Sequence, residues 1–371
     1  MKRRVLLASY EVPGLGGAST STYALYQKMR RDGLDAHLVN LVDGFDVPYV
    51  QYVLGADYGN PKWLPSVQNC VLTEPRHRRH EALARLVDDV SPDVILARGD
   101  IAAALLKLAA PSARVIYAAA GCQQVGIQMA QGWVDSALAI LDGRPRTARA
   151  PALISGRESE AVASADLILA GSDLLKALLD HFLPYWHACK LFPDAIWSAE
   201  WIHEAAAAEG VVAAPFPERS IDLLFVASSW SRVEKNLPMV RRTAARLPGL
   251  RIAIVGECDR PVPGATSYGF VADTGRVLAL MADSKVLVCP SAFDASPGIL
   301  FEASSMGCNV VASRNCGNWM LCHEELLVDP FTEDGFVEAA RRALRRKYPD
   351  NMSRFLERGS YARLLDVLAA L

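Results

Sequence analysis

Two acidic and two basic side chains occur where a predicted strand runs into a predicted helix. Asp294 and Glu302, separated by seven residues, lie in one such segment, and Arg232 and Lys235 lie in another. A carboxylate in the apolar stretch around Glu302 is costly unless it binds hydroxyls or a charged partner. Two cations directly after a strand suit a diphosphate leaving group, because they neutralise the charge that develops as its bond breaks. Plainer alternatives stay open: Asp294 could cap a turn, and Glu302 and Lys235 could be solvated surface residues.

The helix that carries Glu302 is predicted from the residues at its two ends. Ser296 is suited to be its N-cap and Pro297 to its first turn, while Gly307 provides a left-handed stop after Met306. Backbone N–H groups at a helix N-terminus have no partner within the helix and attract anions. Three such amides are expected here and would form a phosphate site: those of Gly298, Ile299 and Leu300.

A glycine-rich loop at residues 13–19 follows the first predicted strand. It nearly fits the dinucleotide-binding fingerprint, with Gly16 and Gly17 before Ser19, which stands where the last glycine belongs. Asp43 ends the second strand, as that fingerprint requires. An NAD-dependent oxidoreductase is therefore an alternative, although Gly14 comes four residues after Tyr10 instead of closing the strand.

These segments belong to a pattern of short β-branched runs that alternate with alanine- and leucine-rich helical stretches. The pattern predicts parallel sheets covered by helices on both faces. We expect strands at residues 4–8, 36–42, 94–97 and 114–117, and a helix end that runs into a strand over residues 160–170. A second series of strands is expected at 221–226, 251–255, 286–289 and 309–312. The chain is thus predicted to be an α/β protein with two doubly wound Rossmann-like domains facing across a cleft. Their predicted ranges are 1–212 and 218–350, with a linker at 209–218, and the amphipathic helix 354–371 could complete the first domain.

Composition excludes several classes of protein. The 371 residues include 39 Lys and Arg and 41 Asp and Glu, so a nucleic-acid binder that depends on a general basic excess is excluded. The eight cysteines are scattered with no C-x-x-C pair, which indicates buried thiols rather than a zinc site. No apolar run approaches the length of about 18 residues that a spanning helix needs. We expect a cytoplasmic protein.

The segment from Asp294 to Ser313 resembles the acidic-x7-Glu motif of retaining GT-B glycosyltransferases of the family 4 type, the glycosyl transferases group 1. That motif reads approximately E-G-F-G-L-V-x-x-E-A-M-A-x-G-x-P-V-V-A-S. The resemblance implies that Asp294 meets hydroxyls of the donor sugar and that Glu302 accepts hydrogen bonds from the ribose. It also implies that Ser296 and the amides from Gly298 to Leu300 contact sugar and phosphate. One departure is that the first acid is Asp rather than the usual Glu.

Other segments extend the resemblance to most of the chain. Lys235 and Asn236 match a Glu-Lys-Gly/Asn element, which implies contact with the donor diphosphate, and Arg232 matches it less closely. The resemblance places the base beside Phe270 and Val271, and donor phosphate near Gly16 and Gly17. Many family members have a histidine in the position of Ala120, facing the donor sugar, and Cys122, Gln123 or Gln124 could supply a contact instead.

Acceptor contacts are expected on the N-terminal half. Four aromatic residues in a long connection suit sugar rings or other flat acceptors, or pack under the loop: Tyr49, Tyr52, Tyr58 and Trp63. Three arginines, Arg76, Arg78 and Arg79, suit a phosphorylated acceptor or peripheral contact with an anionic membrane, or form a solvated helix start.

The function expected from these features is a retaining, metal-independent glycosyltransferase. Its donor would be a nucleoside-diphosphate sugar, UDP- or GDP-linked, and its acceptor a hydroxyl of a saccharide, a lipid-linked or a small molecule. No cofactor and no metal are expected, since no Asp-x-Asp pair suited to chelating the diphosphate occurs. The alternatives are the NAD-dependent oxidoreductase and a nucleotide-sugar binder without transferase activity, which the Ala120 position favours.

Overall fold

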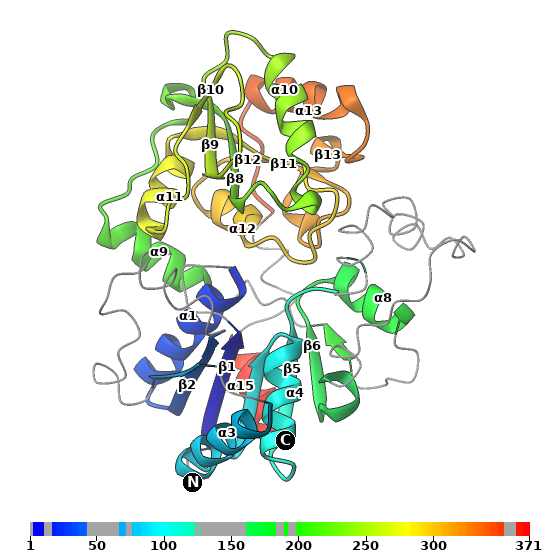
Figure 1. Ribbon diagram of the computed structural model, residues 1–371. Coiled ribbons are helices and arrows are strands. Elements are labelled where there is room, and N and C mark those ends of the chain that lie inside the picture. The colour runs from blue at the N-terminus through cyan, green and yellow to red at the C-terminus, as the bar shows by residue number, and fades with distance from the viewer. Residues whose placement is uncertain are drawn as a thin grey trace, which may run out of the picture. The chain divides into compact units, whose positions relative to one another are not determined.

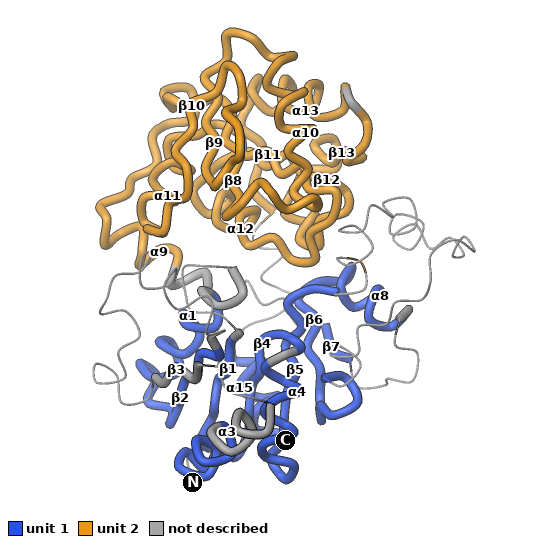
Figure 2. Tube along the Cα trace, in the orientation of Figure 1, with its two compact units in different colours: residues 1–124, 152–198, 359–371 blue, residues 125–151, 199–358 orange. Residues whose placement is uncertain are grey.

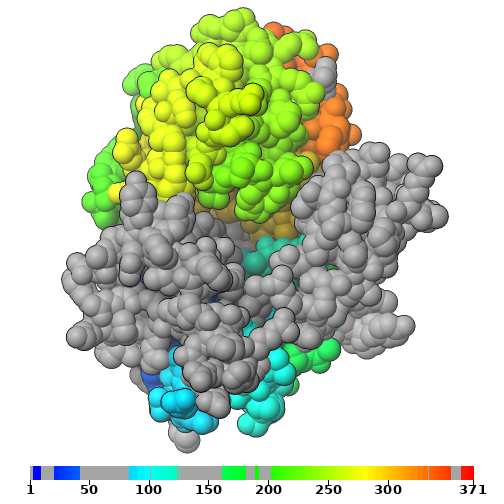
Figure 3. Space-filling view, in the orientation of Figure 1, coloured from blue at the N-terminus to red at the C-terminus, as the bar shows by residue number. Residues whose placement is uncertain are grey.

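The computed structural model describes residues 3–10, 17–42, 67–71, 76–122, 125, 161–182, 189–191, 198–351 and 361–371, and Figure 3 draws the others in grey. The chain forms two compact units, coloured separately in Figure 2. Unit 1 comprises residues 1–124, 152–198 and 359–371, and unit 2 comprises residues 125–151 and 199–358. The division falls at residue 198, ahead of the predicted linker at 209–218.

Hydrogen bonds from Arg219 explain why the predicted linker belongs to unit 2. The buried guanidinium of Arg219 donates to the carbonyl of Ala214 at 3.0 Å, and to those of Ser284 at 2.7 Å and Gly307 at 2.9 Å. These bonds join the end of the linker to the second sheet and its helices. The short 3-10 helix η2 (Phe216–Glu218) is therefore fixed within unit 2.

Unit 1 is built on a seven-stranded parallel sheet in the order β3-β2-β1-β4-β5-β6-β7. Its strands are β1 (Arg4–Tyr10), β2 (Asp35–Val42), β3 (Val67–Val71), β4 (Val94–Arg98), β5 (Arg114–Ala119), β6 (Leu167–Ala170) and β7 (Cys189–Leu191). Its helices are α1 (Gly17–Arg31), α3 (Arg76–Val90), α4 (Asp100–Ala109), α8 (Asp173–Phe182) and α15 (Tyr361–Ala370). The C-terminal helix α15 belongs to this unit, because its Leu364 and Leu368 are buried with Leu25 and Met29 of α1 against the sheet.

Unit 2 repeats the design with a six-stranded parallel sheet in the order β10-β9-β8-β11-β12-β13. Its strands are β8 (Ile221–Ser229), β9 (Ile252–Glu257), β10 (Ala265–Ser267), β11 (Ser284–Cys289), β12 (Asn309–Ser313) and β13 (Leu327–Val328). Its helices are α9 (Ser198–Ala208, whose first residue counts with unit 1), α10 (Leu237–Ala245), α11 (Thr274–Ala282), α12 (Gly298–Ser305) and α13 (Glu333–Arg345). Three further 3-10 helices follow its strands: η3 (Val233–Lys235), η4 (Trp319–Leu321) and η5 (Glu324–Leu326).

Helices cover both faces of this second sheet. Met239 of α10 and Phe336 of α13 are buried in one cluster with alternate strand residues such as Leu223 and Val286. Helices α11 and α12 pack against each other, away from the α10 and α13 pair (Figure 1). Two doubly wound α/β sheets were predicted, and the structure confirms them. None of the described helices has the length and apolarity needed to cross a bilayer.

Candidate active site

A lysine and a carboxylate form a close ion pair at the carboxyl ends of neighbouring strands of unit 2. Lys235 Nζ donates to Asp294 Oδ2 at 2.5 Å, and both side chains are only 16% exposed. Lys235 follows β8, and Asp294 follows β11, the next strand in the sheet. Lys235 and Asp294, which belong to two separate sequence motifs, therefore form a single ion pair.

Asn236 fixes the position of Lys235. It has left-handed backbone angles, φ 59° and ψ 48°, which asparagine tolerates better than most residues. Its Nδ2 donates to the carbonyls of Pro290 at 3.0 Å and Pro330 at 3.1 Å. Both amide hydrogens are engaged by the fold, so this side chain positions Lys235 rather than offering its amide to a ligand.

The loop of Asp294 is fixed by backbone hydrogen bonds to the segment that follows β12. Asp294 donates to the carbonyl of Asn315 at 3.1 Å, and Gly317 donates to that of Asp294 at 2.9 Å, so that Asp294 forms an isolated parallel bridge with Cys316. The amide of Ala292 also donates to the carbonyl of Glu234 at 2.8 Å. Three loops are thus joined around the ion pair.

The charge of Lys235 is preserved in this setting. Burial disfavours the ammonium ion, but the Asp294 carboxylate outweighs burial and raises the pKa of Lys235 above its ordinary value. The nearby thiol of Cys289 is buried, and its Sγ lies 3.7 Å from Cys316 Sγ. The hydrogen bond between the two thiols lowers the pKa of Cys289 and raises that of Cys316. Lys235 is therefore a permanent cation at neutral pH.

Helix α12 begins beside the ion pair. It starts at Gly298, and its N-cap is Pro297, with φ −68° and ψ 108° and no side-chain cap. The prediction that Ser296 caps this helix is therefore wrong. The amide of Leu300 donates to the carbonyl of Pro297 at 3.3 Å, so the amides that lack a backbone partner within the described residues are those of Gly298 and Ile299. The predicted stop is correct, since Gly307 has φ 74°.

Glu302 turns its carboxylate toward the start of its own helix. A Cβ built on Gly298 would lie 3.7 Å from Glu302 Oε1. The residue is half-buried, and burial raises the pKa of its carboxyl group to about 7. Among the described residues, the side chain has no hydrogen-bond partner. A partly dehydrated, unpaired acceptor lies beside the two unpaired amides.

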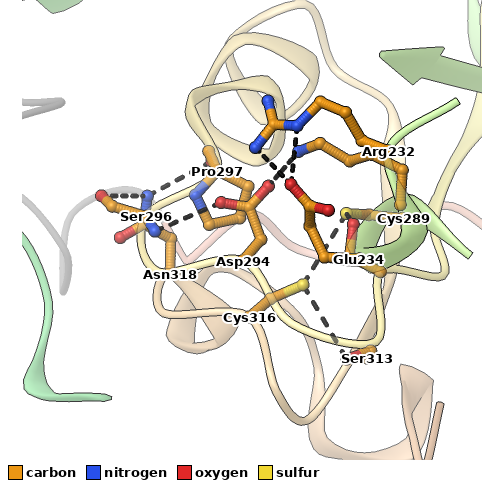
Figure 4. Close-up of polar contacts among 11 residues, drawn as sticks. Arg232, Glu234, Cys289, Asp294, Ser296, Pro297, Ser313, Cys316 and Asn318 are labelled. Carbon is orange, nitrogen blue, oxygen red and sulfur yellow. Dashed lines mark hydrogen bonds and ion pairs between the residues drawn. The ribbon is translucent and has the colours of Figure 1, made fainter. Parts of the chain in front are cut away.

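Arg232 lies at the rim of the site. Its side chain is 54% exposed and pairs with Glu234, with Nη2 and Oε1 at 2.5 Å (Figure 4). The Glu234 carboxylate therefore balances the charge of Arg232, as the Asp294 carboxylate balances that of Lys235. A ligand diphosphate would have to share Arg232 with that carboxylate.

The segment predicted to hold a nucleotide base follows β10. Phe270 and Val271 are both half-buried there. The preceding loop is held by the amide of Gly256, which donates to the carbonyl of Gly269 at 2.7 Å. Gly256 has φ 124°, and a Cβ at this position would lie 2.1 Å from the carbonyl oxygen of Ala227. Only glycine lets the ends of β8 and β9 approach in this way.

Sequence reasoning missed Asn318, which lies between β12 and η4. It is 1% exposed and contacts Ser296 and Pro297, the residues just before α12 (Figure 4). Asn318 is 22 residues from Ser296 in a stretch without hydrophobic periodicity, so no local signal identifies it. Among the described residues, no group of three His, Cys, Asp or Glu side chains could hold a metal ion.

The predicted residues of unit 1 are only partly described. Gly17 is the first residue of α1, and Ala120 is exposed directly after β5, with the buried Cys122 two residues further on. Arg76, Arg78 and Arg79 lie in the first turn of α3, where the structure describes the backbone alone. Seven residues lie outside the described part of the chain: Gly16, Tyr49, Tyr52, Tyr58, Trp63, Gln123 and Gln124.

Known proteins identify the domain that carries this site. Residues 220–346 match the family model described as Glycosyl transferases group 1. No curated protein matches the chain by sequence. The match covers β8 to α13, which includes Lys235, Asp294, α12 and Asn318.

Solved structures share the fold of the chain. Sucrose-phosphate synthase from Thermosynechococcus elongatus is 16% identical with a TM-score of 0.63, covering 93% of this chain and 90% of its own. HepE from Anabaena in complex with UDP-glucose is 14% identical with a TM-score of 0.62, covering 100% of both chains. The UDP-forming α,α-trehalose-phosphate synthase from Burkholderia xenovorans, in complex with glucose-6-phosphate, is 15% identical with a TM-score of 0.61, covering 99% of both. The chain therefore has the fold of these GT-B glycosyltransferases, and residues 220–346 match the glycosyl transferases group 1 domain.

Proposed function

We propose that the chain is a retaining, metal-independent glycosyltransferase that moves a sugar from a nucleoside-diphosphate sugar to a hydroxyl acceptor. The observation that carries this proposal is the grouping of the Lys235–Asp294 ion pair, the start of α12 and Glu302. A UDP-linked donor is supported by HepE, solved with UDP-glucose, and by the UDP-forming trehalose-phosphate synthase. A GDP-linked donor is the alternative.

The site offers a complement to each part of such a donor. Lys235 and the amides of Gly298 and Ile299 attract the diphosphate through charge and hydrogen bonds. Glu302 provides an acceptor for the ribose hydroxyls, and Asp294 one for hydroxyls of the transferred sugar. Phe270 and Val271 are proposed to contact the base.

In the proposed reaction, the bond between the anomeric carbon and the β-phosphate oxygen breaks, and its electron pair stays with the diphosphate. Lys235 and the helix amides stabilise the negative charge that develops on the leaving group. Arg232 contributes if the diphosphate displaces it from Glu234. The acceptor oxygen bonds to the anomeric carbon on the face that the diphosphate leaves, and its proton passes to the departing phosphate oxygen. No carboxylate base is needed for this step.

We place acceptor binding on unit 1, at the carboxyl end of β5, which ends at Ala119 just before Ala120. The acceptor class remains a hydroxyl of a saccharide, a lipid-linked or a small molecule. A cytoplasmic location, with peripheral membrane contact through Arg76, Arg78 and Arg79, is part of the same proposal. Gly16 and Gly17 are proposed to approach the donor phosphates.

A thermal-shift screen of the purified chain against UDP, GDP, dTDP, ADP and NAD, with EDTA present, tests the donor class first. A ligand at about 100 times its dissociation constant should stabilise the fold by about 2.7 kcal/mol. Stabilisation by one nucleoside diphosphate supports the proposal. A response to NAD alone favours the oxidoreductase alternative, and no response to any nucleotide contradicts both.

Release of the nucleotide from its sugar donor, with and without a panel of hydroxyl acceptors, tests the reaction. Lys235→Ala should lower turnover about 100-fold or more while changing donor affinity less, because its charge is needed late in bond cleavage. Lys285→Ala is a matched control, since Lys285 pairs with Asp222 at 2.9 Å and is 18% exposed, but lies at the opposite end of β11. Equal losses in both variants would contradict the assignment of Lys235. Donor binding without release or transfer would indicate the nucleotide-sugar binder.

A further inference from the structure

Two ion pairs of different exposure meet in the candidate active site. Lys235 and Asp294 form the inner pair, in which both side chains are 16% exposed. Arg232 and Glu234 form the outer pair, in which the side chains are 54% and 22% exposed (Figure 4). Burial and the nearby charge of Arg232 both act to lower the pKa of Lys235, against the stronger effect of Asp294. The two cations are therefore close neighbours, and each has its own carboxylate.

The charges of these two pairs cancel. Two cations and two carboxylates leave no net charge among the four side chains. A nucleoside diphosphate carries several negative charges, and it gains little from a cation whose charge is already balanced. Binding through charge therefore requires that one cation turn, at least in part, from its carboxylate to the diphosphate. Which pair gives way decides what opposes the binding of the donor.

The outer pair gives way at less cost than the inner one. An exposed ion pair is weak because water hydrates both ions when they separate, whereas separating a buried pair leaves a charge without water or a partner. Lys235 also has no need to leave Asp294, since an ammonium group has three N–H donors and can donate to a carboxylate and a phosphate together. Arg232 is thus the cation that a diphosphate can draw away.

Glu234 holds Arg232 by one edge of its guanidinium group. The Nε and Nη2 atoms donate to the same oxygen, Oε1, at 2.6 Å and 2.5 Å. Among the described residues, the guanidinium has no other hydrogen-bond partner. The backbone of Glu234 is fixed, because its carbonyl accepts from the amide of Ala292 at 2.8 Å. The exposed arginine side chain is therefore the movable member of the outer pair.

We propose that Glu234 is a positioning residue that restrains Arg232 in the free protein and so opposes donor binding. A bound diphosphate takes over the guanidinium, and the released carboxylate is hydrated, since the Glu234 side chain is 22% exposed. The full charge of Arg232 is then available only when a diphosphate occupies the site. This inference rests on the proposed function, which assigns the diphosphate to Lys235 and the start of α12. It adds that the chain binds its donor less tightly than its two cations would allow.

Calorimetric titration with UDP tests the proposal, with GDP as the probe if the chain responds to GDP alone. Glu234→Gln keeps the shape of the side chain but removes its charge. It should bind UDP about three- to fivefold more tightly, the upper end of the effect of an exposed ion pair. Glu234→Ala cannot accept a hydrogen bond from Arg232 and should bind UDP at least as tightly as Glu234→Gln. A carboxylate with a merely structural role would not tighten binding when it is removed.

Two further variants show whether the gain depends on Arg232. Glu257→Gln removes a carboxylate that is exposed at the carboxyl end of β9 and has no ion pair among the described residues. This control should change the affinity for UDP less than about twofold. The double variant that combines Arg232→Ala with Glu234→Gln should lose the gain and bind UDP no more tightly than wild type. Thermal midpoints close to that of wild type should show that all variants are folded.

The outcomes separate this inference from the proposed function. If neither Glu234 variant binds UDP more tightly than wild type, Glu234 does not oppose donor binding, and the inference is overturned while the donor site stands. It is overturned as well if Glu257→Gln gives the same gain, or if the double variant keeps it. If the folded wild-type chain binds no nucleoside diphosphate at all, the proposed function fails, and this inference fails with it.

Discussion

Lowering the pH from about 8 to about 6 should weaken the binding of a nucleotide sugar, because its ribose hydroxyls need Glu302 ionised. Burial raises the pKa of Glu302 to about 7, so about half of the free protein carries the proton at neutral pH. Hydroxyls that donate to a carboxylate favour its charged form, and binding therefore releases that proton. One pH unit below the pKa, about a tenth of the carboxyl is ionised. The expected loss in affinity is about tenfold, or about 1.4 kcal/mol.

Isothermal titration calorimetry with UDP-glucose or GDP-mannose across this pH range measures the effect. A nucleotide sugar is the better ligand here, because its diphosphate is a diester with no group that titrates in this range. Glu302→Gln should bind about 1–3 kcal/mol more weakly at high pH, since the unpaired hydroxyls lose a charged acceptor, and its affinity should not change with pH. The same pH dependence in both proteins, or a wild-type affinity that is independent of pH, would refute the role given to Glu302.

The same carboxyl group should affect the stability of the ligand-free protein in the opposite sense. Because burial raises its pKa in the folded state, Glu302 contributes stability that is fully present below its ordinary pKa of 4.5 and is lost as the pH rises through about 7. At pH 8, Glu302→Gln should therefore raise the free energy of unfolding, by at most about 3 kcal/mol. Chemical denaturation at several pH values measures this. A variant that gains stability and loses ligand affinity has lost a group kept for binding.

Three further predictions concern other parts of unit 2. Asp294→Asn should lower turnover about 100-fold, because an amide cannot balance the charge of Lys235, and circular dichroism should show an intact fold. Gly298→Ala should stabilise the fold by about 0.4–1 kcal/mol, since a Cβ there meets only Glu302 Oε1 at 3.7 Å. Calorimetry should nevertheless show weaker donor binding, because the added methyl group covers the start of α12. Burial opposes ionisation of Asp222, but hydrogen bonds from Arg251 and Lys285 outweigh burial and lower the pKa of Asp222. The ionised Asp222 therefore contributes stability above about pH 4, and this stability is lost as the pH falls further. Asp222→Asn should accordingly be destabilised at neutral pH in urea unfolding, and the difference should shrink in acid.

The sequence predicted the central strands of both sheets because each is a run of buried β-branched and aliphatic residues. Val286 to Cys289 and residues 309–312 are examples, and the structure confirms both. The sequence analysis missed β3, β7, β10 and β13. The last three have three, three and two residues, and all four are edge strands, where a strand buries less apolar surface and the periodic signal is weak.

The start of α12 shows where local capping rules fail. Ser296 and Pro297 fit the preferred residues for an N-cap and a first turn, but the helix begins one residue later. A contact from outside the segment accounts for the difference, since Ser296 Oγ accepts from Asn318 Nδ2 at 3.3 Å instead of capping the helix. A preference read from the neighbouring residues cannot include a partner that lies 22 positions away.

The same limit applies to the site as a whole. The sequence could place Lys235 and Asp294 at the carboxyl ends of strands, but the order β8-β11-β12 is what makes those ends neighbours. Their pairing then depends on Asn236, which binds two distant carbonyls, and on the bridge between Asp294 and Cys316. Each of these contacts joins residues more than 20 positions apart, where no pattern of residue types predicts a distance. A side chain such as Asn236 can therefore match a ligand-binding motif by sequence and yet serve the site by holding the lysine beside it.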